Sequence, residues 1–115
     1  FQLNEGGLIT NSVTQPSAGS GPFGFEFGRD GVLFNAEANT GSVSSYHLTQ
    51  QDTLATISAA VPDHQAAACW ITLTGSARFA FISNTASGTL SSYNISGNGT
   101  VSLENSVAAS LPGGL

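Results

Sequence analysis

Apolar and polar residues alternate with a period of two in short segments of this chain, and glycine-rich turns separate the segments. Residues 23–27 alternate strictly, and residues 32–36 form the continuous apolar run that is typical of a strand covered on both faces. Residues 42–48 and 53–60 complete a set of four expected strands. No segment has sustained helical spacing with caps, so the pattern predicts an all-β fold of antiparallel strands.

The same order of strands then occurs a second time. Residues 41–48, Gly-Ser-Val-Ser-Ser-Tyr-His-Leu, return as residues 88–95, Gly-Thr-Leu-Ser-Ser-Tyr-Asn-Ile, which gives a repeat of about 47 residues. Residues 69–73 correspond to the first alternating segment. Repeats of this length are supersecondary units that each bury an apolar face against a neighbour.

The repeat predicts two full four-stranded units with partial segments at both ends. We expect residues 1–14 to be the end of a preceding unit, residues 22–60 the first full unit, residues 68–108 the second full unit, and residues 109–115 a flexible tail. The connection between the full units is too short for a helix. The chain begins at Phe1 without a methionine, so we also expect a processed product or an excised piece.

Charged residues make up only 8% of the chain, with two arginines, no lysine and a formal net charge of -5. Nucleic acids and anionic membrane surfaces both require clustered cations, so we expect neither as a partner. No apolar run approaches the roughly 20 residues of a membrane-spanning helix.

The compartment is predicted from weaker signals. The single cysteine, Cys69, cannot form a disulfide within the chain. Asn94 and Asn98 begin two acceptor sequences for N-glycosylation, which suit a secreted glycoprotein. We therefore predict secretion, with a cytoplasmic location as the alternative.

Several stretches carry a resemblance to a known family. These are residues 22–27 (PFGFEF), 33–46 (LFNAEANTGSVSSY), 68–71 (ACWI) and 81–85 (FISNT). They resemble the lactonase-type seven-bladed β-propellers, which include 6-phosphogluconolactonase-like proteins and carboxymuconate cyclases. The resemblance implies an incomplete propeller of two full blades and the outer strand of a third. It also implies a small sugar lactone or carboxylate as ligand, and no cofactor.

The resemblance also implies a catalytic set of His, Arg and Glu side chains at the mouth of the central channel. Many members carry Pro-His-Gly at the start of an inner strand, where this chain has Pro22-Phe23-Gly24 and Ala68-Cys69-Trp70. We therefore expect a binding or self-assembling module without activity of its own, completed by copies of itself or by further blades. The alternative is a lactone hydrolase or lactonizing enzyme.

Antiparallel strands place the loop before the first strand of a blade and the turn between its second and third strands at one end of the sheet. Glu37 and His64 are the candidate catalytic pair at this end, because a carboxylate and an imidazole together provide acid and base catalysis. Gln65, Trp70 and Asn84 are the candidate ligand-binding residues.

Each candidate also has a structural interpretation. His64 is then an ordinary loop histidine, Glu37 a solvated residue or turn cap, Cys69 a small buried hydrophobe, and Trp70 a side chain packed between blades. Tyr46 and Tyr93 occupy equivalent positions and are expected in the core. Arg29 and Arg78 lie at the opposite end and are assigned to no site. The sequence contains no metal-binding cluster, phosphate loop or serine-nucleophile motif.

Overall fold

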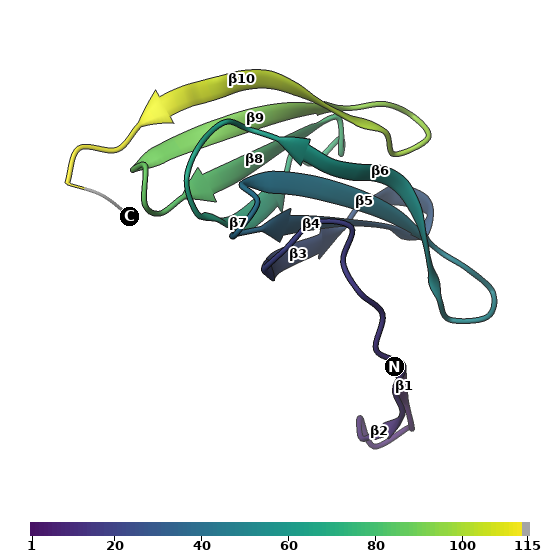
Figure 1. Cartoon of the computed structure of the whole chain (residues 1–115). Coiled ribbons are helices and arrows are strands. Elements are labelled where there is room, and N and C mark those ends of the chain that lie inside the picture. The colour runs from purple at the N-terminus through teal and green to yellow at the C-terminus, as the bar shows by residue number, and fades with distance from the viewer. Residues whose placement is uncertain (114–115) are drawn as a thin grey trace.

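The computed structural model describes residues 1–113, which form three antiparallel sheets (Figure 1). The strands are β1 (Gln2–Leu3), β2 (Ile9–Asn11), β3 (Pro22–Phe27), β4 (Val32–Glu37), β5 (Ser42–Leu48), β6 (Leu54–Pro62), β7 (Ala68–Leu73), β8 (Phe79–Asn84), β9 (Thr89–Ile95) and β10 (Val101–Ser110), with a single 3₁₀ turn, η1 (Arg29–Gly31). Strands β3 to β6 form the first sheet in sequence order, and β7 to β10 form the second. The two four-stranded meanders confirm the fold class predicted from the repeat.

Tight turns set the register of each meander. The turn between β4 and β5 ends at Gly41, whose φ of +60° is readily adopted only without a side chain. A Cβ at Gly41 would also lie 2.6 Å from the carbonyl oxygen of Gln65. A glycine is therefore required where the first sheet meets the loop that leads into the second.

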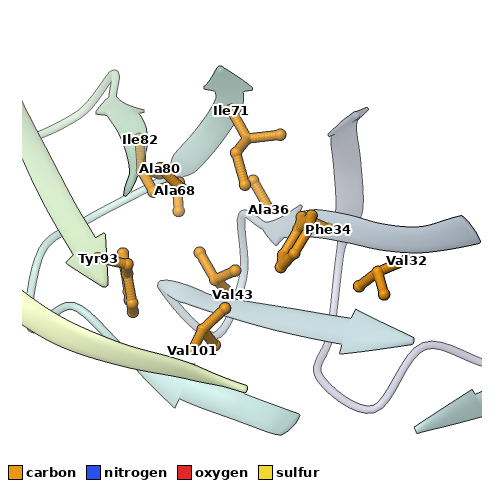
Figure 2. Close-up of a cluster of buried hydrophobic side chains, with 10 residues drawn as sticks. All are labelled: Val32, Phe34, Ala36, Val43, Ala68, Ile71, Ala80, Ile82, Tyr93 and Val101. Carbon is orange, nitrogen blue, oxygen red and sulfur yellow. The ribbon is translucent and has the colours of Figure 1, made fainter. Parts of the chain in front are cut away.

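The hydrophobic core lies between the two sheets (Figure 2). Val32, Phe34, Ala36 and Val43 come from the first sheet, and Ala68, Ile71, Ala80, Ile82, Tyr93 and Val101 come from the second. Because each sheet is a single layer, the side chains that one sheet buries are covered by the other. Strands β3 and β4 lie against β7, so the first strand of each sheet is close to its counterpart. Burial of Tyr46 and Tyr93 confirms their predicted place in the core.

Two predicted boundaries shift in the structure. Strand β6 extends to Pro62, beyond the expected end at Ala60. Residues 109 and 110, expected in a flexible tail, are the last residues of β10, because they pair with Leu90 and Thr89 of β9. Residues 114 and 115 of that predicted tail lie outside the described residues.

The N-terminal hairpin of β1 and β2 forms a two-stranded sheet apart from the other two (Figure 1). Gln2 Nε2 donates a hydrogen bond of 2.8 Å to the Asp52 carboxylate. Farther along, Gln15 forms two hydrogen bonds with the backbone of Leu54. The assignment of residues 1–14 to a preceding blade remains a prediction.

The repeat provides a matched test of the core. Phe34 is 1% exposed and Phe81, at the equivalent position of the second sheet, is 37% exposed. We expect Phe34→Ala to lower the free energy of unfolding by about 3–4 kcal/mol, because it removes a buried ring and leaves a cavity. Phe81→Ala should cost less than about 1.5 kcal/mol when the chain is dilute. Chemical denaturation of both variants measures the difference, and equal losses would contradict this assignment of the core.

Candidate functional site

Four connecting segments meet at one end of the two sheets. We call this end the candidate rim; it consists of residues 17–21, 38–41, 63–67 and 85–88. The backbone N–H of Asp63 donates to Gly41 O at 3.0 Å, and that of Ala66 donates to Ser87 Oγ at 2.7 Å. The segment before β7 is therefore joined to the β4–β5 turn of the first sheet and to the β8–β9 turn of its own sheet. Glu37, His64, Gln65 and Asn84 all lie at or beside the rim.

Glu37 ends β4 and is fully buried, with donors on both carboxylate oxygens. Oε1 accepts hydrogen bonds from the Ser17 hydroxyl, from the Gly19 N–H at 2.8 Å and from the Ser44 hydroxyl at 2.8 Å. Oε2 accepts one from the Ser42 hydroxyl at 2.6 Å. This carboxylate holds the segment before β3 against β4 and β5.

The surroundings of Glu37 exclude the solvated, turn-capping interpretation of this residue. A Cβ at Gly19 would lie 2.2 Å from Glu37 Oε2, so the loop backbone passes directly over the carboxylate. Its hydrogen-bonding positions are occupied by four donors. A substrate at the rim would have to displace this loop before it could reach Glu37.

The second sheet has an equivalent network in which the acidic residue occupies a different position of the repeat. Asn84 stands in the place of Glu37, and its Nδ2 donates to Ser91 Oγ at 2.8 Å and to Thr89 Oγ1 at 3.2 Å. Asp63, in the segment before β7, stands in the place of Ser17. Each network therefore contains one carboxylate, supplied by β4 in the first sheet and by the preceding loop in the second.

The hydrogen bonds that Asp63 can accept are limited by the donors around it. Oδ1 accepts a hydrogen bond from the Gln65 N–H at 2.8 Å. Ser91 Oγ lies 3.2 Å from Asp63 Oδ2 and 2.7 Å from the carbonyl oxygen of Ser106, but it has one proton to donate. If that proton goes to the closer carbonyl, contact with Oδ2 is favourable only when Asp63 itself carries a proton. This geometry favours a raised pKa for the Asp63 carboxyl.

The electrostatic surroundings of Asp63 point the same way. Burial raises the pKa of its carboxyl above the ordinary value of 3.8, opposed by the hydrogen bonds from Gln65 and Ser91 and by nearby His64. Tyr93 lies within the electrostatic influence of both acids: burial raises the pKa of its hydroxyl, and the negative charges of Asp63 and Glu37 raise it further. The neutral Tyr93 hydroxyl donates to Val61 O at 2.8 Å.

The remaining candidates have different surroundings. His64 is exposed and has a φ of +62°. Gln65 uses both ends of its amide inside the protein, donating to Ser106 Oγ at 2.8 Å and accepting from Thr89 Oγ1 at 3.2 Å. Trp70 is 62% exposed and meets Phe23 edge to face, with ring centroids 5.7 Å apart. Trp70 is therefore mostly exposed but contacts β3 of the first sheet, where a Cβ at Gly24 would lie 2.9 Å from its ring.

Sequence reasoning missed Asp63 because no motif marks it. Its signal is positional: it occupies the place in the second repeat that Ser17 occupies in the first. Cys69 is half-buried, with Sγ 3.1 Å from Thr85 Oγ1. Asn94 lies within β9 and donates to the Glu104 carboxylate, whereas Asn98 is exposed in the turn after β9. The use of either asparagine as a glycosylation site remains a prediction.

Within residues 1–113, no group of three or more His, Cys, Asp or Glu side chains is arranged to hold a metal ion. No helix in the same part of the chain has the length and apolar character needed to cross a membrane.

The two stacked four-stranded meanders, with their inner strands together and their loops gathered at one end, define the class. They are blades of a β-propeller, and the two sheets do not close into a ring. The family model described as "Lactonase, 7-bladed beta-propeller" matches residues 1–114. The chain therefore belongs to the seven-bladed lactonase family.

Comparison with solved structures finds a similar fold in a crystal structure of a protein from Lactobacillus plantarum. The TM-score is 0.61 at 13% sequence identity, and the match covers 73% of this chain. It covers 25% of the other chain, so this chain matches about a quarter of that protein. The comparison with curated proteins found no match.

The raised pKa of Asp63 predicts a pH-dependent contribution to stability. Since the pKa is raised on folding, the contribution is fully present below about pH 3.8 and is lost as the pH rises through the pKa of the folded chain. In Asp63→Asn, the side-chain amide can accept a hydrogen bond from the Gln65 N–H and donate one to Ser91 Oγ at any pH. We expect the wild type to lose stability relative to this variant as the pH rises from about 3 to 7. Chemical denaturation across that range measures the difference.

Glu37→Gln is the matched control. Here a neutral amide replaces a carboxylate that accepts four hydrogen bonds. Because hydrogen bonds to a charged group contribute more than those to a neutral one, we expect a loss of about 2–3 kcal/mol near neutral pH. Asp63→Asn should be at least as stable as the wild type under the same conditions. A stability difference between wild type and Asp63→Asn that grows with pH in favour of the wild type would contradict a raised pKa of Asp63.

Proposed function

We propose that this chain is a two-blade section of a lactonase-type propeller that works by packing against further blades of the same architecture. The section supplies part of the wall of a central channel and has no lactone-hydrolysing activity alone. The observation that supports this most directly is the composition of its two uncovered sheet faces.

The face of the first sheet that is turned away from the second is aromatic. Phe25 and Phe27 pair with Asn35 and Leu33 on this face, and the two rings are 62% and 51% exposed. The equivalent position to Phe25 in the second sheet is Ile71, which is 7% exposed within the core. The uncovered face of the first sheet is thus equivalent to the face with which the second sheet contacts the first.

The uncovered face of the second sheet is also aromatic, and it is equivalent to the face of the first sheet that lies in the core. Phe79 and Phe81 are 38% and 37% exposed, while their equivalents in the first sheet, Val32 and Phe34, are 8% and 1% exposed in the core. The two uncovered faces therefore correspond to the two sides of the interface between the sheets. Because the faces differ, copies of the chain would join head to tail, in a closed ring or an open filament.

Lactone chemistry is the second candidate, and it rests on the family together with the exposed Phe23 and Trp70 rings at the starts of the inner strands. Aromatic faces at a channel are suitable for stacking on a sugar or lactone ring. His64 is the exposed candidate base at the rim. The burial of Glu37 beneath the loop argues against a catalytic pair with this imidazole.

Self-association is the test of the first candidate. We expect the weight-average mass in sedimentation velocity to rise above the 11.6 kDa of one chain as concentration increases. Phe25→Ser and Phe81→Ser, on opposite faces, should each weaken association by about tenfold, because each removes a large apolar contact. Leu8→Ser, in the separate N-terminal hairpin, is the control and should change nothing. A wild-type chain that stays monomeric at all concentrations would overturn the proposal, and electron microscopy distinguishes rings from filaments.

Turnover of lactones is the test of the second candidate. With a sugar δ-lactone and a muconolactone as substrates, we expect the purified chain to match the buffer rate, because Glu37 is unavailable as a partner for His64. Release of acid followed with a pH indicator measures this rate. Turnover that is lost in His64→Ala would establish the enzymatic alternative.

A further inference from the structure

A cleft of about 440 Å³ lies between the two sheets at the end away from the candidate rim. It is formed by η1 of the first sheet, the turn from β7 to β8 and the turn from β9 to β10. This size is within the range of small-molecule pockets. Because both sides of the cleft belong to this chain, its existence does not depend on further blades.

Both cationic side chains of the protein line this cleft. Arg29 comes from η1 and Arg78 from the turn before β8, and the chain has no other Lys or Arg. Within residues 1–113, neither guanidinium forms an ion pair or a side-chain hydrogen bond. In a chain of net charge -5, the two positive charges are thus gathered at one place, with Asp30 as the acidic side chain beside them.

The floor of the cleft is apolar, and its edges carry hydroxyl groups. Val32, Phe34 and Ile95 line the floor, and Ser76 and Ser96 line the sides. Gly99 packs closely against this apolar surface: a Cβ there would lie 2.8 Å from a methyl group of Val32, and its φ is +88°. The cleft therefore combines an apolar surface with two planar cations and the hydroxyl groups of Ser76 and Ser96, of which Ser96 donates to Asn98 Oδ1.

We propose that this cleft binds a compact organic anion, a carboxylate or a phosphate ester. The guanidinium groups of Arg29 and Arg78 hold the oxyanion, because their paired N–H donors match the oxygens of such groups. The apolar part of the ligand lies over Val32, Phe34 and Ile95. Ser76 provides an additional hydroxyl donor, whereas the Ser96 hydroxyl already donates to Asn98 Oδ1. This site is separate from the rim and independent of the function proposed above.

The test uses probes that separate the charge from the apolar body. Benzoate and phenyl phosphate carry both, benzamide lacks the charge, and inorganic phosphate lacks the body. We expect the two organic anions to shift the backbone amide signals of Gly97 and Gly99 in NMR titrations, because both residues line the cleft. The tighter of the two identifies the preferred oxyanion. Benzamide and inorganic phosphate should bind at least about tenfold more weakly.

Variants assign the binding to the cleft. Arg29→Gln and Arg78→Gln should each weaken binding by about tenfold, and Asp30→Asn should strengthen it by removing a repelling carboxylate. Ala86→Glu, at the opposite end, makes the same change in net charge as loss of one arginine and should leave affinity within about twofold. The amide spectrum of each variant verifies its fold.

Three results would overturn the proposal. The first is the absence of saturable shifts with either organic anion. The second is equal binding of benzamide, which would make the cleft an apolar site without anion recognition. The third is unchanged affinity in both arginine variants.

Discussion

Each sheet of this protein is one layer thick, so its apolar side chains are buried only when another sheet covers them. Phe34 and Ile82 come from different sheets and are almost completely buried in the interface. Burying one such side chain stabilises a fold by roughly 1.5–3 kcal/mol. The interface between the sheets is therefore the main source of stability for the whole chain. The same dependence explains why Phe25 and Phe81, on the outer faces, are exposed aromatic residues.

The buried polar networks maintain the geometry of that interface. Glu37 holds the segment before β3, and Asp63 holds the loop between the sheets, where Ser91 and Gln65 surround it. The two acids occupy different positions of the repeat, yet each ties a loop to its sheet: Glu37 links the loop to β4 and β5, and Asp63 links its loop to Ser91 of β9. Both repeats thus have a hydrogen-bonded network that fixes a loop, but the carboxylate comes from a strand in the first repeat and from a loop in the second. The carboxylates at the rim therefore stabilise the fold and are bonded to donors of the protein itself.

The sequence was sufficient to predict the meanders, their repeat and the family, because alternation, glycine turns and the Ser-Ser-Tyr match are local signals. It was also sufficient to place Glu37 and His64 at the same end. It could not predict that Glu37 is buried, because the covering loop at Gly19 is distant in sequence and has no pattern of its own. The sequence left two interpretations of Trp70 open, because a large aromatic residue in an inner strand suits packing and channel lining equally.

The distribution of charge distinguishes the two ends of the molecule. At the rim, Glu37 and Asp63 are buried among donors, so little of their charge is available to a ligand. At the other end, Arg29 and Arg78 are exposed and border an apolar floor. Removing an anion from water costs free energy, which a positively charged group offsets only if it has no other partner. Within the described residues, neither arginine is paired with another side chain. An acidic chain can therefore recognise an anion locally, because screening in salt limits the repulsion from distant carboxylates to roughly 8–10 Å.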